Sequence, residues 1–216
     1  MIAAVVFDLD GVLVDTETVW DDVREALVRE RGGHWHAHAQ ADMMGMSSVE
    51  WSRYMHEELG LSESPQAIND EVVARMLVRY RADLPLIDGA VPAVERLANA
   101  FPLALASSSN RPLIDAVLQT SGLDRHFAAT VSSEEVARGK PAPDVFLEAA
   151  RRLGVAPRLC AAIEDSSNGL RAAHAAGMRV IALPNAHYPP GTDALALADV
   201  VVGTLRELTA DVVRAR

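Results

Sequence analysis

Short, mainly apolar segments recur along this chain and constrain its fold more than any other feature. The first, residues 2–7, runs without a polar residue and ends at Asp8. Such a run is typical of a strand buried on both faces, as in a parallel sheet. Segments with helical periodicity separate the runs, so the alternation predicts an α/β fold with a parallel sheet. The later apolar runs are residues 103–106, 128–131, 160–163, 180–183 and 200–202.

Residues 15–82 interrupt this alternation. Their apolar residues recur every three or four positions in three successive stripes, and no strand pattern lies among them. The sequence therefore predicts an all-helical insert at residues 15–82, directly after the first strand. The α/β core would consist of residues 1–14 and 83–216.

Polar side chains stand where the predicted strands end. Open α/β sheets bind ligands at the carboxyl ends of their strands, which meet at one edge even when they are far apart in the sequence. The residues at these positions are Asp8 and Asp10 after the first strand, Ser107, Ser108, Ser109 and Asn110 after the second, Lys140 in the loop between the third and fourth, and Glu164 and Asp165 after the fourth.

This set of side chains points to a reaction class. Carboxylates that converge in a cleft repel one another unless a cation joins them, and oxygen ligands without histidine or cysteine suit Mg²⁺. A lysine can balance the charge of a phosphoryl group, and serine with backbone amides can complete a phosphate site. The residues alone therefore indicate magnesium-dependent phosphoryl transfer, with an aspartate as the candidate nucleophile.

The same residues carry a family resemblance. Residues 8–16, which read DLDGVLVDT, are followed in order by Ser107, Lys140 and the pair Glu164 and Asp165. This ordered set resembles the four signature segments of the haloacid dehalogenase superfamily, in the subgroup with a helical cap after the first strand. The resemblance spans essentially the whole chain and implies a Rossmann-like core with the helical insert as its cap.

The resemblance also implies a role for each catalytic residue. Asp8 would attack phosphorus and form an aspartyl-phosphate. Asp10 would protonate the leaving oxygen and then take a proton from the hydrolytic water. Ser107 would hydrogen-bond the phosphoryl oxygens, and Lys140 would orient Asp8 and offset the charge.

The implied cofactor is Mg²⁺, and the implied substrate is a small phosphorylated metabolite. Ser108 and Asn110, which neighbour Ser107, are expected to contact that substrate. The expected metal ligands are Asp8, the backbone carbonyl of Asp10, Asp165 and, directly or through water, Glu164.

The insert offers weaker indications of specificity. Asp15 or Thr16 is a plausible N-cap of its first helix, and Glu17 either complements the helix dipole or accepts hydrogen bonds from sugar hydroxyls. Residues 43–48 resemble the cap loop that sets specificity in this subgroup, but they supply methionines and serines where the sugar-phosphate mutases carry basic residues. Arg53 is the nearest cation in sequence, and a solvated surface position is expected for it.

Other conspicuous residues of the insert have structural interpretations. Trp51 and the nearby methionines are expected to pack inside the cap rather than to contact substrate. His34, His36 and His38 alternate in a segment without a strand pattern, which favours a solvated stretch over a metal site.

Composition limits the location and partners of the chain. A net charge of -10 disfavours nucleic-acid binding. The lone Cys160 allows no intramolecular disulfide, and the first apolar run is too short for a signal peptide or a membrane span. We expect a cytoplasmic protein that is a monomer or a weak homodimer and binds no membrane.

The leading hypothesis is a phosphatase of a small sugar or polyol phosphate. A phosphomutase of the β-phosphoglucomutase type is the first alternative, although Trp20 occupies the position at which those mutases carry a histidine. A dehalogenase is disfavoured because attack on a carbon–halogen bond needs no acid such as Asp10. A non-catalytic phosphoacceptor module is disfavoured because its fold has no such helical insert.

Overall fold

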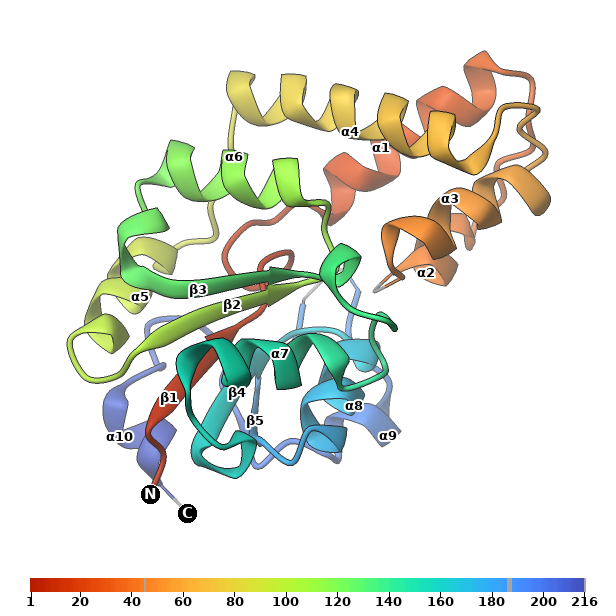
Figure 1. The fold of residues 1–216 in the computed structure, drawn as a ribbon. Helices are drawn as coiled ribbons and strands as arrows, with labels where there is room; N and C mark the ends of the chain where they lie inside the picture. Colours follow the sequence, from red (N-terminus) through yellow and green to blue (C-terminus); the bar gives the residue numbers. More distant parts are fainter. Residues whose placement is uncertain (45, 186–187, 216) are drawn as a thin grey trace.

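The computed structural model describes residues 1–44, 46–185 and 188–215. Within these residues, six parallel strands form one sheet in the order β3-β2-β1-β4-β5-β6 (Figure 1). The predicted Rossmann-like α/β fold is therefore confirmed. The strands are β1 (Ala4–Phe7), β2 (Leu103–Ser107), β3 (Phe127–Ser132), β4 (Cys160–Glu164), β5 (Arg179–Ala182) and β6 (Val200–Val201).

The central strand β1 pairs with β2 on one side and with β4 on the other. The chain first builds the sheet outward through β2 and β3, and then returns to the far side of β1 to add β4, β5 and β6. The strand order therefore reverses beside β1, and ligands of open α/β sheets bind at such a switch point. Asp8 follows β1 directly and so lies at this position.

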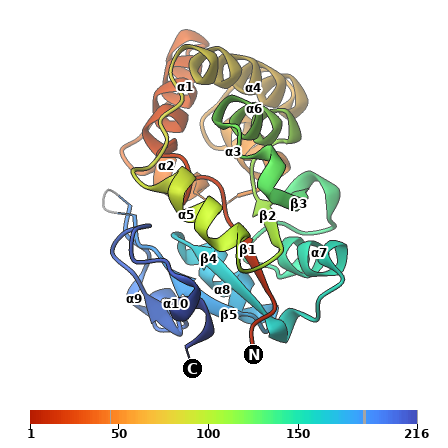
Figure 2. The ribbon, with the colours of Figure 1, turned by 90° about the vertical axis from the view of Figure 1, so that its left-hand side faces the viewer.

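Helices cover both faces of the sheet because the strands are buried on both sides. Val5 and Phe7 of β1 pack in the hydrophobic cluster that includes α5, α6 and α10, whereas Ala4 and Val6 pack against α7, α8 and α9 (Figures 1 and 2). These helices are α5 (Ala90–Ala98), α6 (Arg111–Ser121), α7 (Asp144–Leu153), α8 (Ser167–Ala175), α9 (Thr192–Leu195) and α10 (Ala210–Arg214).

Four helices lie between β1 and α5 and stand above the carboxyl ends of the strands (Figures 1 and 2). Two neighbouring chain segments connect them to the core, and Val14 bridges to Leu86 where these segments meet. We therefore propose that residues 15–82 form a cap domain on the core of residues 1–14 and 83–216. The cap helices are α1 (Glu17–Glu30), α2 (Ala39–Met43), α3 (Ser48–Glu57) and α4 (Pro65–Ala82).

None of the helices within the described residues is long and apolar enough to span a bilayer.

Candidate active site

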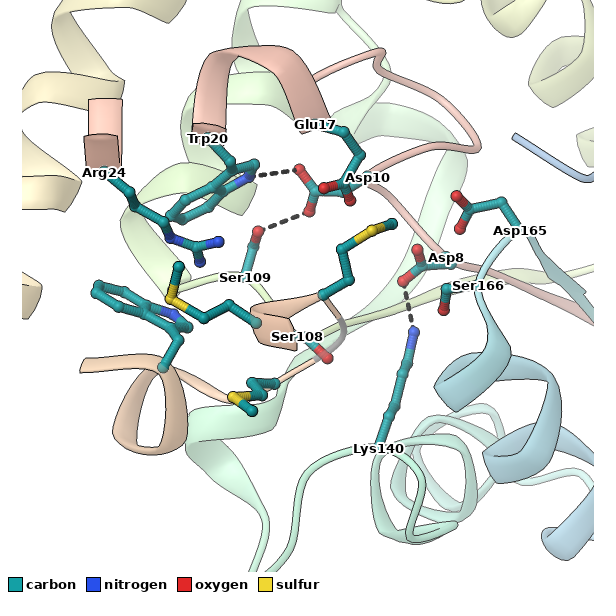
Figure 3. A pocket seen from close by; sticks show the side chains of 14 residues that line it. Asp8, Asp10, Glu17, Trp20, Arg24, Ser108, Ser109, Lys140, Asp165 and Ser166 are labelled. Atoms are coloured by element: carbon teal, nitrogen blue, oxygen red, sulfur yellow. Dashed lines mark hydrogen bonds and ion pairs between the residues drawn. The ribbon is translucent and has the colours of Figure 1, made fainter. Parts of the chain in front are cut away.

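A pocket of about 50 Å³ lies between the cap and the carboxyl ends of β1, β2 and β4 (Figure 3). The core contributes most of its charged side chains, and the cap contributes most of its apolar ones. The residues that line it are Asp8, Asp10, Glu17, Trp20, Arg24, Met43, Met44, Met46, Trp51, Ser108, Ser109, Lys140, Asp165 and Ser166.

Lys140 joins two carboxylates at the base of the pocket. Its Nζ donates to Asp8 Oδ1 and to Glu164 Oε1, at 2.6 Å in both cases, and all three side chains are buried. Burial alone would lower the pKa of Lys140, but the negative charges of Asp8 and Glu164 outweigh that effect and raise it. The ammonium group therefore stays charged and pairs with both carboxylates.

Glu164 is held by backbone donors as well as by Lys140. Its Oε2 accepts hydrogen bonds from the N–H groups of Asp165 at 2.9 Å and Ser166 at 3.0 Å. A Cβ on Gly169 would lie 1.7 Å from Glu164 Oε1, so the carboxylate occupies space that only glycine leaves open. Glu164 is thus fixed in place, and most of its hydrogen-bonding capacity is already used.

Asp165 lies beside this cluster. Its Oδ2 is buried and has no hydrogen-bond partner among the described residues. Oxygens of Asp8, Glu164 and Asp165 lie within 4.8 Å of one another. Burial, together with the charges of Glu164 and Asp8, raises the pKa of Asp165. Three buried carboxylates with one lysine fit a divalent cation, because a cation would offset their repulsion and pair with the unsatisfied oxygen.

Gly11 makes the position of Asp165 possible. Its φ of +79° is in the left-handed region, and a Cβ there would lie 2.0 Å from Asp165 Oδ2. The turn after β1 can therefore pass close to the carboxylate only because residue 11 has no side chain.

Asp10 accepts hydrogen bonds from both the core and the cap. Ser109 Oγ donates to its Oδ2 at 2.6 Å, while Thr16 Oγ1 at 2.5 Å and Trp20 Nε1 at 3.3 Å donate to Oδ1. Thr16 is the N-cap residue of α1, one of the two positions expected, but its side chain makes no capping hydrogen bond. Its hydroxyl is used instead to hold Asp10 at the cap–core boundary.

The three serines after β2 have different environments. Ser107, the predicted phosphoryl ligand, is fully buried, and its Oγ accepts a hydrogen bond from the Ser109 N–H at 3.0 Å. Ser108 and Ser109 line the pocket, and Ser107 is not among the lining residues. Ser109 was not predicted as a site residue, because three consecutive serines carry no signal that tells which of them faces the pocket.

Asn110, a predicted substrate-binding residue, connects the core to the cap. Its Nδ2 donates to Asn69 of α4 at 2.9 Å and to Glu134 Oε1 at 2.7 Å. The same Glu134 oxygen accepts from Ser48 of α3 at 3.2 Å. The structure therefore places Asn110 at the cap–core junction and outside the pocket lining.

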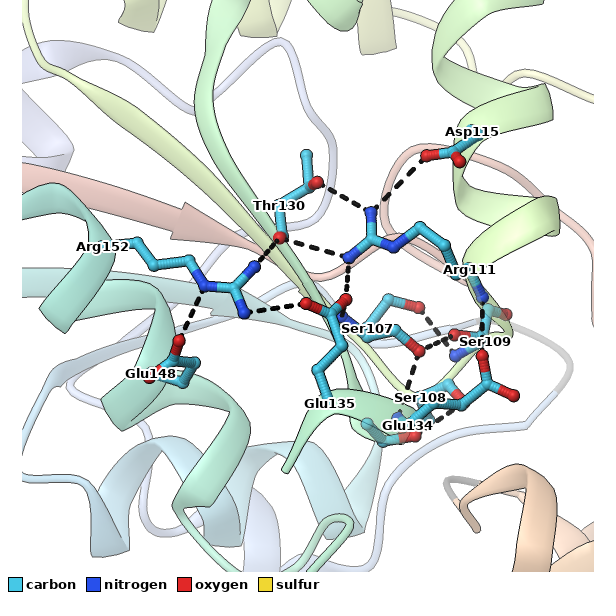
Figure 4. Close-up of polar contacts among 12 residues, drawn as sticks. Ser107, Ser108, Ser109, Arg111, Asp115, Thr130, Glu134, Glu135, Glu148 and Arg152 are labelled. Atoms are coloured by element: carbon cyan, nitrogen blue, oxygen red, sulfur yellow. Dashed lines mark hydrogen bonds and ion pairs between the residues drawn. The ribbon is translucent and has the colours of Figure 1, made fainter. Parts of the chain in front are cut away.

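An ion-pair network anchors the segment that carries Glu134 (Figure 4). Arg111 and Arg152 both bond Glu135, and Arg152 Nη2 lies 2.7 Å from its Oε2. Arg111 also donates to Thr130 Oγ1 at 2.8 Å, and Arg152 donates to the Thr130 carbonyl at 2.8 Å. These contacts tie Ser133–Glu135 to β3 and thereby fix the core side of the junction.

The cap side of the pocket contains a charged network. Gln40 Nε2 donates to Glu17 Oε2 at 2.9 Å, and Arg24 Nη1 donates to Gln40 Oε1 at 3.1 Å. Glu17, a predicted substrate contact, lines the pocket. Burial and the negative charge of Asp10 raise the pKa of Glu17 to about 7. Burial lowers the pKa of Arg24 to about 10, so its guanidinium remains charged at neutral pH.

Arg24 is a pocket residue that was not predicted from the sequence. Arg53 is exposed, as expected, but Arg24 is the cation of the cap that lines the pocket. A signal was present, because Arg24 lies four positions after Trp20 and three before Leu27 and so shares the buried face of α1. The cap therefore presents more than methionines and serines to the pocket.

The predicted specificity loop contributes through its methionines. Met43, Met44 and Met46 line the pocket, while Gly45 lies outside the described residues. Trp51 is buried in the cap and also lines the pocket, so its packing role does not exclude contact with substrate. Asn168 Nδ2 donates to the Met44 carbonyl at 3.2 Å and connects the loop to the core.

The three neighbouring histidines do not gather into a metal site among the described residues. His36 Nε2 lies 3.0 Å from the Tyr54 hydroxyl, and its Nδ1 accepts from the His38 N–H. His34 and His38 are exposed, which agrees with the expected solvated stretch.

Replacing Glu17 with glutamine should stabilise the protein increasingly as pH rises. The pKa of Glu17 is about 7 in the folded protein against an ordinary value of 4.5, so the folded state favours the protonated side chain. The free energy of unfolding of wild type therefore falls as pH rises from the lower value through the higher one. Between about pH 5 and pH 8 the variant should gain up to roughly 3 kcal/mol in free energy of unfolding relative to wild type. Denaturant titrations at both pH values measure this gain, and a difference independent of pH would contradict it.

Comparison with known proteins identifies the family. The model of the haloacid dehalogenase-like hydrolases matches residues 2–177, and the chain belongs to that family. Hexitol phosphatase B of Escherichia coli K12 is 33% identical over an alignment of 228 residues, and this alignment covers 97% of this chain and 95% of that protein. The family predicted from the signature segments is thus confirmed, and the chain is an enzyme of the hydrolase class.

One further sequence relative and one solved structure are also similar to this chain. The bifunctional riboflavin kinase/FMN phosphatase of Arabidopsis thaliana is 34% identical over 212 residues, which cover 95% of this chain. This chain spans 54% of that protein, about half of its length. The crystal structure of CbbY from Rhodobacter sphaeroides in complex with phosphate has a TM-score of 0.84 and 26% identity, and covers 96% of both chains.

Proposed function

We propose that this protein is a Mg²⁺-dependent phosphatase that hydrolyses a small sugar or polyol phosphate through an aspartyl-phosphate on Asp8. The observation that carries the proposal is the contact of Asp8 with Lys140 at 2.6 Å, beside the unsatisfied carboxylate of Asp165. Asp10 lies near Asp8 at the cap–core boundary, and its carboxylate points toward Trp20 and Ser109 (Figure 3). A nucleophile, a charge-balancing lysine and an acid–base group thus converge on one cavity.

The residues would divide the reaction into two displacements. Asp8 forms a bond to phosphorus, while the bond from phosphorus to the alcohol oxygen breaks and Asp10 gives that oxygen a proton. Asp10 then takes a proton from water, which attacks the same phosphorus and releases Asp8 and inorganic phosphate. Lys140 offsets the charge on the phosphoryl oxygens, and Ser107 acts through the loop that presents Ser108 and its backbone amides.

Asp8, Asp165 and the backbone carbonyl of Asp10 would hold the metal. Mg²⁺ bound there supplies positive charge that stabilises the phosphoryl oxygens and keeps Asp8 ionised. Glu164 would act mainly by positioning Lys140, since its Oε2 already accepts backbone hydrogen bonds and its Oε1 accepts from Lys140.

The name of one relative supports the proposed substrate class. That relative is hexitol phosphatase B of Escherichia coli K12. We further propose that the enzyme acts in the cytoplasm as a monomer or weak homodimer. The charge of -10 supports the expectation that it binds no nucleic acid.

A phosphomutase is the second candidate, and Arg24 in the cap side of the pocket is the observation that keeps it open. A mutase must bind a bisphosphate with a phosphate site at each end. We predict instead that inorganic phosphate is the main product, because Glu17 lies beside Arg24 and Trp20 contacts Asp10 where the mutases carry a histidine.

Phosphorus NMR distinguishes the two activities. The protein is incubated with Mg²⁺ and a hexose 6-phosphate, and in parallel with β-glucose 1-phosphate and a trace of the 1,6-bisphosphate. Release of inorganic phosphate without a bisphosphate requirement is expected. Conversion of glucose 1-phosphate to glucose 6-phosphate much faster than phosphate release would identify a mutase.

A further inference from the structure

Arg24 has an unusual environment for a buried cation. Its side chain is 5% exposed, and its guanidinium carbon lies 4.4 Å from the Trp20 ring centroid and 4.8 Å from that of Trp51. The two indole rings therefore hold the guanidinium by cation–π contacts. Figure 3 shows this group on the side of the pocket opposite Asp8 and Lys140.

The hydrogen bonds of Arg24 are incomplete. Nη1 donates to Gln40, but Nε is buried and has no hydrogen-bond partner among the described residues. Leaving a buried charged group without its full set of acceptors is costly, and such a group at a pocket wall commonly serves a ligand. Arg24 thus combines a fixed orientation with unused donor capacity.

The charges around Arg24 restrict what it can bind. Glu17 connects to it through Gln40, and Asp10 is a further negative charge in the same pocket. Asp10 and the ionised form of Glu17 both place negative charge near the guanidinium, so a second anionic group would meet repulsion from these carboxylates. A hydroxyl group avoids that conflict, because it can accept from Arg24 and donate to Glu17.

We propose that Arg24, Gln40 and Glu17 form a cap-side subsite that binds the uncharged, hydroxyl-bearing end of the substrate, with Arg24 as a specificity-determining residue. Trp20 and Trp51 supply apolar walls for the carbon chain. The inference rests on the proposed phosphatase function. It specifies the chemistry of the substrate end that lies away from the phosphate. It also makes a cap arginine compatible with the prediction that the enzyme does not require a bisphosphate.

A matched pair of substrates tests the subsite in the wild-type enzyme. Glucitol 6-phosphate and 6-phosphogluconate differ at the end distant from the phosphate, where the first has a hydroxymethyl group and the second a carboxylate. With Mg²⁺, kcat/KM should be higher for glucitol 6-phosphate by roughly tenfold or more, because the carboxylate meets Glu17. Equal values, or a preference for the carboxylate, would overturn the proposal.

Arg24→Met tests the residue itself, since it keeps an unbranched side chain and removes the donors. Its kcat/KM with glucitol 6-phosphate should fall roughly 10- to 100-fold, mainly through KM. The ratio of this kcat/KM to that for acetyl phosphate, which has no distal hydroxyls, should fall at least tenfold. Arg53→Met, at an exposed arginine of the same cap, is the control and should leave the ratio unchanged.

The outcomes separate this inference from the proposed function. An equal loss on both substrates would mean that Arg24 only holds the cap together, and would overturn the inference alone. If wild type hydrolyses no phosphomonoester, the proposed function and the inference both fall. Arg24→Lys, which keeps the charge, should recover part of the ratio, and the wild-type substrate pair decides the question even if Arg24→Met does not fold.

Discussion

Asp8→Asn is expected to leave no measurable phosphate release. An amide is a poor nucleophile for phosphorus, and the change also removes a charged partner of Lys140 and a proposed metal ligand. Losing the nucleophile of a covalent mechanism costs on the order of 10⁴-fold or more in kcat. Steady-state phosphate release at saturating substrate and Mg²⁺ measures this loss.

The matched control makes the same chemical change at Asp193. That carboxylate is 72% exposed and pairs with Arg171 on the surface, where an ion pair contributes little to stability. Asp193→Asn should therefore retain wild-type turnover. If Asp8→Asn kept a tenth of the activity, Asp8 could not be the nucleophile.

Removal of divalent metal with EDTA is expected to abolish turnover, and Mg²⁺ should restore it better than Ca²⁺. Three buried carboxylates converge within 4.8 Å, and repulsion among them opposes the ionised form of Asp8 when no cation is bound. Ca²⁺ prefers more ligands at longer distances and would place the nucleophile poorly. Full activity in EDTA would rule out the proposed mechanism.

Thermal unfolding tests the same site without turnover. Mg²⁺ at a hundred times its Kd should stabilise the protein by about 2.7 kcal/mol, which raises Tm. Asp165→Asn should raise Tm in EDTA, because it removes a buried charge that Asp8 and Glu164 repel, and it should weaken the response to Mg²⁺. A variant that loses stability in EDTA and keeps the full Mg²⁺ response would contradict the assignment of Asp165.

The sequence predicted the carboxylates of the site because the sheet topology brings them together. Asp8 and Asp165 follow adjacent parallel strands, β1 and β4, so their convergence needs no detailed packing information. Asp10 lies two residues after Asp8, and the lysine was found because its loop matches a family segment. The fold was predictable for a different reason. Apolar runs indicate strands that are buried on both faces, and such strands occur in parallel sheets covered by helices on both sides.

The cap contacts could not be predicted because they depend on how two packed units meet. Asn110 bonds Asn69, a residue 41 positions earlier, only because α4 lies over the start of α6. Arg24 lies on the buried face of α1, which the helical spacing indicates, but the spacing does not show that Trp20 and Trp51 enclose its guanidinium. Strand ends thus carry strong sequence signals, whereas side-chain packing at the cap–core boundary does not.

Trapping the covalent intermediate tests the central claim most directly. The enzyme is quenched during turnover of glucitol 6-phosphate with Mg²⁺ and treated with borohydride, which reduces an acyl phosphate to an alcohol. Peptide mass spectrometry then locates the reduced side chain. The proposed mechanism predicts reduction at residue 8 in wild type and none in Asp8→Asn. Steady hydrolysis without reduction at residue 8, or reduction at Asp10 or Asp165 instead, would contradict it.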